Sequence, residues 1–206
     1  MTDEPELNSA YALGSMDETK ALYAAWAESY DRDFCDAQGY QTPRELVRTF
    51  AERGGTGPVL DVGAGTGVVG QGLVASGVGP VDALDLSAEM LEVARRKDIY
   101  RDLIEADVTR PLPVSGYRGI VSAGTFTLGH VGPEGLPPLL EAGEPGCLYV
   151  ISVNAKHYVE AGFEAFFAEI ETDIAGFQSR EFRFYDDRAD EDHRYDTGLM
   201  ISFVKR

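Results

Sequence analysis

The sequence predicts an α/β fold, with a mostly parallel sheet covered by helices on both of its faces. A short apolar run at 59–62 enters a glycine-rich segment, 63–70, and a helical pattern follows. This order is typical of a buried strand, a tight turn and the start of a helix. A second apolar run, 81–84, ends in an acid, Asp85, and further apolar runs alternate with helical patterns. Alternation of this kind indicates a doubly wound sheet.

The expected elements follow one another as helices and strands in turn. Helices are predicted at 17–31, 42–53, 68–76, 88–97, 136–140 and 163–174. Strands are predicted at 59–62, 80–85, 101–106, 119–123, 147–153, 181–184 and 199–204, with connections at 124–132, 143–146 and 186–196. The last two strands have no helix between them, so we expect an antiparallel hairpin at the sheet edge. The whole is expected to form a Rossmann-like, doubly wound sheet of about seven strands.

Two of the helix starts carry capping residues. Thr42 is expected to cap its helix, with Pro43 at the first helical position and Glu45 completing a capping box. Ser87 is expected to cap the helix that carries Met90 on its inner face.

The chain of 206 residues is expected to form one domain. Residues 1–15 are polar and aperiodic, and we expect them to be disordered or loosely attached. Residues 16–206 are expected to form the domain, with N-terminal helices over 16–55 acting as a lid and a Rossmann-like core over 57–206.

Aromatic residues mark the first predicted helix. Tyr23, Trp26 and Tyr30 lie at helical spacing. They form either a stripe packed on the core or part of a lid that excludes water from a pocket.

Composition limits the classes of partner. The net charge of −17 repels phosphate backbones and anionic lipids, and no basic stripe offsets it, so we expect neither a nucleic-acid nor a membrane partner. The first residues lack the basic flank and apolar stretch of a secretion signal. The two cysteines, Cys35 and Cys147, are far apart without metal-ligand spacing, which predicts free thiols and a cytoplasmic location.

The glycine-rich segment allows more than one ligand. Gly65, Gly67 and Gly70 satisfy the dinucleotide fingerprint, whereas Gly63, Gly65 and Gly67 have the tighter spacing found in methyltransferases. Asp85 is placed to accept hydrogen bonds from ribose hydroxyls, or it is an ordinary cap before the next helix. The terminal hairpin favours the methyltransferase interpretation, because a dehydrogenase domain more often continues with parallel βα units.

The chain resembles the class I methyltransferases that use S-adenosylmethionine, in particular the small-molecule group that includes the Williams–Beuren-region methyltransferase-like proteins. The segments that carry the resemblance are YAAWAESYDRDF (23–34), LDVGAGTG (60–67), LDLSAEML (84–91), EADVTRPLP (105–113) and GIVSAGTFTLGHV (119–131). It implies S-adenosylmethionine as the cofactor, a small-molecule methyl acceptor, and no metal.

The resemblance also implies roles at the cofactor's methionine end. Asp61 and the turn formed by Gly63, Ala64, Gly65 and Gly67 would hold the methionine amine and carboxylate.

Further roles concern the adenosine. Asp85 would accept the ribose hydroxyls, with Leu86 and Met90 against the adenine. Asp107 would accept the adenine amine while the Val108 amide donates to the ring; alternatively, Asp107 is a solvated loop acid.

The methyl group would lie near the fourth strand. Ala123 and Gly124 would lie beside the sulfonium, under a lid that includes Tyr23 and Tyr30. The reaction would be an in-line displacement that depends on positioning and on exclusion of water.

The acceptor side is less clear in the sequence. His130 is the candidate general base, or it hydrogen-bonds within its loop. Trp26, Asn154, His157 and Tyr158 are candidates for the acceptor pocket. The acidic run before His193 is interpreted as a solvated loop and not as a metal site.

Two other functions remain open at this point. One is an NAD(P)-dependent oxidoreductase that uses Gly65, Gly67, Gly70 and Asp85. The other is a module that binds the cofactor without catalysis. The sequence does not indicate the oligomeric state.

Overall fold

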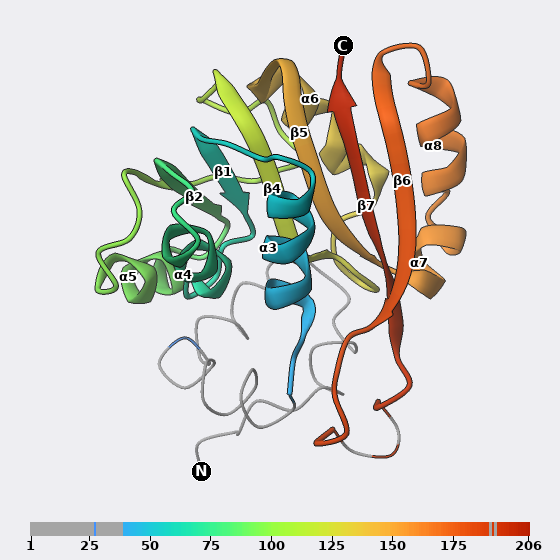
Figure 1. Ribbon diagram of the computed structural model, residues 1–206, viewed down its shortest axis with the longest axis horizontal. Helices are drawn as coiled ribbons and strands as arrows, with labels where there is room; N and C mark the ends of the chain where they lie inside the picture. The colour runs from blue at the N-terminus through green and yellow to red at the C-terminus, as the bar shows by residue number, and fades with distance from the viewer. Residues whose placement is uncertain (1–26, 28–38, 190, 192) are drawn as a thin grey trace.

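Seven strands form one sheet in the order β3-β2-β1-β4-β5-β7-β6 in the computed structural model, which describes residues 27, 39–189, 191 and 193–206 (Figure 1). The strands are β1 Val59–Val62, β2 Val81–Asp85, β3 Leu103–Glu105, β4 Tyr117–Phe126, β5 Gly143–Asn154, β6 Ile174–Arg183 and β7 Thr197–Lys205. The helices are α3 Thr42–Glu52, α4 Val68–Ala75, α5 Ala88–Arg95, α6 Leu136–Ala142, α7 Ala155–Glu160 and α8 Phe163–Glu169. The predicted helix at 17–31 lies outside the described residues.

The pairing of the strands confirms the expected topology. β3, β2, β1, β4 and β5 are parallel, whereas β7 is antiparallel to both β5 and β6. The predicted hairpin therefore forms the edge of the sheet. The strand order reverses between β1 and β4, and ligands of doubly wound sheets bind at the carboxyl ends of the strands beside such a point.

The sheet is buried on both faces because its strands are apolar on both sides. On β1, Val59 belongs to a core formed with α3 and α4, whereas Leu60 and Val62 belong to a second core formed with α6 and α8. Figure 1 shows α3 in front of the sheet, and α7 and α8 beside β6 at its right-hand end. This two-sided burial fixes the register of β1 and therefore the position of the turn that follows it.

α3 packs on the sheet. Leu46 and Phe50 are fully buried, and the helix contacts β4 and β5. It belongs to the residues 16–55 that the sequence suggested as a lid, and its packing makes it a layer of the core. A lid function for the part before residue 39 stays a prediction.

The start of α3 differs from the prediction. Gln41 is the N-cap, its side chain makes no capping bond, and its amide donates to the Phe184 carbonyl at 2.8 Å. Thr42 is therefore the first helical residue and is fully buried. Glu45 completes no capping box, because its carboxylate accepts from Arg48 and Arg180.

Three other boundaries were also predicted incorrectly. β4 continues to Phe126 through an irregularity after Ser122, where a loop was expected. β5 begins at Gly143, which pairs with Tyr117, in place of the expected turn. Ile174 has helical spacing from Ile170 but starts β6, where it pairs with Lys205. In each case a partner distant in the sequence decides the structure.

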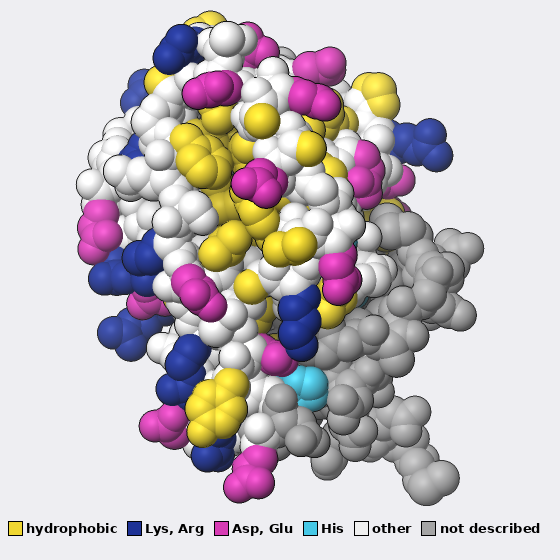
Figure 2. All heavy atoms as spheres, turned by 90° about the vertical axis from the view of Figure 1, so that its right-hand side faces the viewer, with side chains coloured by type: hydrophobic (Ala, Val, Ile, Leu, Met, Phe, Trp, Pro, Cys, Tyr) yellow, Lys and Arg dark blue, Asp and Glu magenta, His cyan; other side chains and the backbone are white. Residues whose placement is uncertain are grey.

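The end of the molecule formed by β6, α7 and α8 exposes apolar surface. Figure 2 faces the right-hand side of Figure 1 and shows hydrophobic side chains gathered there, with acidic and basic side chains around them. Val159 of α7 and Phe177 of β6 are 77% and 41% exposed. Within the part of the chain that the structure describes, every helix is too short or too polar to traverse a lipid bilayer.

Phe50 provides a test of this packing. A Cβ at Gly55 or Gly119 would lie 2.3 or 2.5 Å from its ring, so the ring fills space left by the two glycines. Phe50→Ala leaves a cavity there, and we expect the free energy of unfolding in urea to fall by about 3–5 kcal/mol. Val74→Ala, at a position on α4 that is 42% exposed, should change it by less than about 0.5 kcal/mol. Equal effects of the two substitutions would contradict the assignment of α3 to the core.

Candidate functional site

The segment between β1 and α4 is a turn of bare backbone. Gly63, Gly65 and Gly67 have φ of 64°, 55° and 96°, in the left-handed region that favours glycine. The amides of Gly63 and Ala64 donate to the Leu84 carbonyl at 2.8 and 3.1 Å, which ties the turn to the end of β2. A Cβ placed on Gly65 would have no heavy atom of the described residues within 4 Å. The turn lies at the start of a helix, which favours an anionic group.

Asp85 connects the glycine turn after β1 to the segment that leads from β2 into α5. Its Oδ2 accepts from the Gly65 amide at 2.7 Å, and its Oδ1 accepts from the Ser87 amide at 2.8 Å. Ser87 in turn caps α5 through a bond from the Met90 amide to its Oγ at 3.2 Å, as the sequence predicted. A carboxylate offers about four acceptor positions, and ribose hydroxyls are donors that suit it.

The tip of β4 lies beside the glycine turn. Ser122 Oγ and Thr125 Oγ1 donate to the Val62 carbonyl at 2.9 and 3.2 Å. The predicted site residues Ala123 and Gly124 lie between them, half-buried, and the Gly124 amide donates to Ser152 Oγ at 3.1 Å. The structure thus brings the predicted methyl-side residues to the same edge of the sheet as the turn.

Two residues at this edge were missed by the sequence analysis. Thr125 Oγ1 would lie 2.0 Å from a Cβ at Gly63, so its side chain packs against the turn. The Tyr40 hydroxyl would lie 3.1 Å from a Cβ at Gly124, and the Tyr40 ring packs at 5.6 Å from that of Tyr185. Thr125 was not predicted as a site residue, because the segment that contains it was expected to be a loop. Nothing local to Tyr40 indicates that the terminal hairpin would hold it there.

Asp107 organises the segment after β3. Its Oδ1 accepts from the Thr109 amide and hydroxyl at 2.8 and 2.7 Å, and its Oδ2 lies 3.8 Å from Arg110 Nε. This local turn explains the acid without a ligand, as the alternative interpretation proposed. A bond to adenine stays a prediction.

The apolar residues expected against the adenine differ in burial. Leu86 is half-buried, whereas the side chains of Met90 and Val108 are buried. Val108 packs in the core on the α6 face of the sheet.

His130 lies in the connection after β4, where its amide donates to the Thr127 carbonyl at 3.0 Å. The same connection is held by His157, whose Nε2 lies 2.9 Å from the Val131 carbonyl. A carbonyl only accepts, so this nitrogen carries the proton. His130 is thereby fixed near the tip of β4.

The other residues expected in the acceptor pocket have structural contacts. His157 is buried and packs edge-on against Phe163 at 5.6 Å. Asn154 caps α7 by accepting from the amides of Lys156 and His157 at 3.0 and 3.2 Å. Tyr158 stacks on Phe163 at 5.8 Å. The structure therefore places these three residues in or around the core on the α7 side, and their role in binding the acceptor stays a prediction.

The aromatic residues Tyr23, Trp26 and Tyr30 lie outside the described residues, so their lid role stays a prediction.

Asp61 is buried beneath the glycine turn. It is fully buried, and its Oδ2 accepts from the Tyr100 hydroxyl at 2.6 Å. Burial raises the pKa of Asp61 to about 7, and the negative Asp85 adds to this, while the Tyr100 hydroxyl and the Gly70 amide oppose it. Tyr100 was missed because it stands alone before β3 with no pattern around it.

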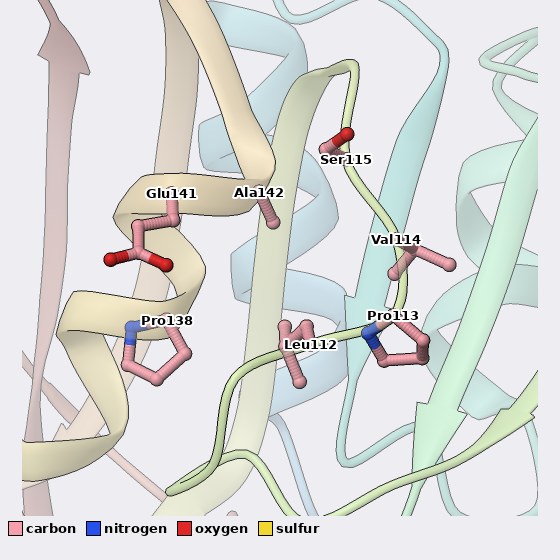
Figure 3. A pocket seen from close by; sticks show the side chains of 7 residues that line it. All are labelled: Leu112, Pro113, Val114, Ser115, Pro138, Glu141 and Ala142. Carbon is pink, nitrogen blue, oxygen red and sulfur yellow. The ribbon is translucent and has the colours of Figure 1, made fainter.

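A separate hollow lies at the other end of β4. It has a volume of about 340 Å³. Figure 3 shows the segment 112–115 on one side of it and α6 on the other. Its lining residues are Leu112, Pro113, Val114, Ser115, Pro138, Glu141 and Ala142. Tyr117 and Gly124 are separated by a strand length of roughly 20 Å, so this hollow does not belong to the site at the glycine turn.

Comparison with known proteins supports the assignment of this edge. Residues 59–142 match the family described as "Methyltransferase domain". The chain is 26% identical over 157 residues to human methyltransferase-like protein 27, a match that covers 73% of this chain and 63% of the human protein. The chain thus spans less than two thirds of that relative.

Solved structures share the fold. A TehB-like S-adenosylmethionine-dependent methyltransferase from Corynebacterium glutamicum is 21% identical with a TM-score of 0.63, over 90% of this chain and 99% of that one. DhpI, solved in a complex with SAH, is 19% identical with a TM-score of 0.62, over 93% and 97%. The matched segment covers the glycine turn, Asp85 and the tip of β4, and the chain shares the fold of these methyltransferases.

Proposed function

We propose that this chain transfers a methyl group from S-adenosylmethionine to a small-molecule acceptor. The observation that carries the proposal is the bond between the Gly65 amide and Asp85, which joins the two βα turns at the carboxyl edge of the sheet. No described residue would contact a Cβ at Gly65, and the bare backbone there and the Asp85 carboxylate suit an adenosyl group bearing a carboxylate and two ribose hydroxyls. When bound, S-adenosylmethionine supplies a methyl group on a cationic sulfur that leaves as a neutral thioether.

The residues of the chain would bind and orient this group. The backbone of the turn would take the carboxylate, Asp85 the ribose hydroxyls and Asp107 the adenine amine. Ala123 and Gly124 would border the space in which the acceptor approaches. Catalysis would depend on alignment and on the exclusion of water, since the reaction disperses the charge on sulfur.

Two other functions can be compared with this site: an oxidoreductase and a module that binds the cofactor without catalysis. Nothing in the comparisons points to an NAD(P)-dependent oxidoreductase. A module that binds the cofactor without catalysis would share every contact of the turn and Asp85. It differs only at the acceptor side, where a transfer assay distinguishes the two.

A small acceptor suits the charge of the chain. The net charge of −17 disfavours nucleic acid, and on the face in Figure 2 acidic side chains lie between the basic ones. Cys147 is a buried free thiol, which suits the reducing cytoplasm that the sequence predicted.

The first test is ligand-induced stabilisation. S-adenosylmethionine or S-adenosylhomocysteine at about 100 times its Kd should add roughly 2.7 kcal/mol to the free energy of unfolding, raising Tm, whereas NAD should not. Asp85→Asn, which removes the charge but keeps the shape, should weaken binding about tenfold or more, since hydrogen bonds to charged groups contribute about 1.5–3 kcal/mol.

Asp102→Asn is the matched control. Asp102 lies just before the amino end of β3, and its side chain is 72% exposed. The glycine turn, in contrast, follows the carboxyl end of β1. Asp102→Asn should leave the shift in Tm unchanged. An equal shift in Asp85→Asn and the wild type would remove Asp85 from the site.

The second test concerns His130 as the general base. With an acceptor identified by transfer of labelled methyl groups, His130→Ala should lower the transfer rate by about 10²–10⁴-fold at saturating cofactor. Cofactor affinity should be unchanged. His193→Ala, in the hairpin loop where its Nδ1 lies 2.9 Å from Asp196, is the control. A full transfer rate in His130→Ala would exclude it as the base.

A further inference from the structure

Tyr100 occupies space next to the glycine turn that two glycines leave free. A Cβ at Gly70 would lie 2.3 Å from the Tyr100 hydroxyl oxygen, and a Cβ at Gly67 would lie 3.0 Å from the ring. The ring therefore packs against the first turn of α4. Its hydroxyl reaches Asp61 on β1, with an oxygen-to-oxygen distance of 2.6 Å.

The Asp61 carboxylate is only partly satisfied. It is fully buried, and its Oδ1 has no hydrogen-bond partner among the described residues. Among the described residues, the groups that shift its pKa are the Tyr100 hydroxyl, the Gly70 amide and the Asp85 carboxylate, and none of them is a cation. A buried carboxylate that lacks a counter-ion destabilises a fold, and such groups concentrate at functional sites.

The other face of the sheet contains a second tyrosine–aspartate pair, at Asp82 of β2, which pairs with Leu60 beside Asp61. The Tyr117 hydroxyl donates to Asp82 Oδ2 at 2.8 Å, and Asp82 is 2% exposed. Here Arg101 also bonds both carboxylate oxygens, so the charge of Asp82 is compensated. The same tyrosine–aspartate contact thus occurs with a cation on one face of the sheet, and without one among the described residues beneath the glycine turn.

We propose that Tyr100 is a positioning residue for S-adenosylmethionine: through Asp61 it fixes a negative charge beneath the glycine turn, where that charge attracts the cationic methionine end of the cofactor. This inference rests on the proposed function. Tyr100 touches no reacting atom, and it acts only through Asp61 and through the shape of the turn.

The proposal makes cofactor affinity depend on pH. In the ligand-free protein Asp61 titrates near pH 7, because burial raises its pKa to about 7. A bound cation favours the charged form, so binding below that pH must release a proton, and affinity rises as the pH increases through 7. The Tyr100 hydroxyl lowers the pKa of Asp61, so removing it moves this rise to higher pH.

The experiment is calorimetric titration of the whole chain with S-adenosylhomocysteine from below to above pH 7. This ligand retains the ammonium group, and the ligand's own titration is common to all variants. In Tyr100→Phe the affinity should be about tenfold weaker near pH 7, and the rise in affinity should occur at higher pH than in the wild type.

Tyr117→Phe is the control. It removes the same hydroxyl from the pair on the other face of the sheet, and affinity and its pH dependence should match the wild type. Asp61→Asn covers the case in which Tyr100→Phe does not fold. Asp61→Asn should bind S-adenosylhomocysteine more weakly than the wild type above pH 7, and its affinity should not rise with pH. An increase in affinity equal to that of the wild type would overturn the proposal.

The outcomes separate this inference from the proposed function. If the wild type binds and Tyr100→Phe has the same pH profile, whatever its absolute affinity, the inference fails and the proposed function stands. If the wild type does not bind at any pH, the proposed function itself fails.

Discussion

The Asp85 carboxylate is the contact on which the functional edge of this protein depends. It accepts the amides of Gly65 and Ser87, at 2.7 and 2.8 Å, and so joins the turn after β1 to the start of α5. Main-chain bonds from the Gly63 and Ala64 amides to the Leu84 carbonyl also join the turn to the end of β2. Because hydrogen bonds to a charged group are strong, the Asp85 side chain strengthens the link between two neighbouring βα units whose strands are already paired.

The two faces of the sheet use buried charge differently. On the face of α6 and α8, Asp82 is paired with Arg101 and Tyr117, an arrangement that satisfies the carboxylate. On the other face, Asp61 accepts from a hydroxyl, and no described residue places a cation beside it. A charge that is compensated within the protein supports the fold, whereas one that is not can be compensated by a ligand. This asymmetry agrees with the position of the glycine turn.

Much of the fold follows from local sequence. β1, β2, the cap at Ser87 and the terminal hairpin were predictable, since apolar runs, glycines and alternation determine them within a few residues. The N-cap predicted at Thr42 was not correct. The Gln41 amide donates a hydrogen bond to the Phe184 carbonyl, so the helix begins one residue earlier than predicted.

The site shows the same division. The glycines and Asp85 stand out in the sequence, because their spacing has a direct physical meaning. Tyr40, Tyr100 and Thr125 do not, since their positions depend on the hairpin, on α4 and on the carbonyl of Val62. A crystal structure of the protein grown with S-adenosylhomocysteine would test this site directly. We expect the ligand to lie against the glycine turn, with its ribose hydroxyls on the Asp85 carboxylate. Electron density for the ligand elsewhere, or none at saturating concentration, would contradict this expectation.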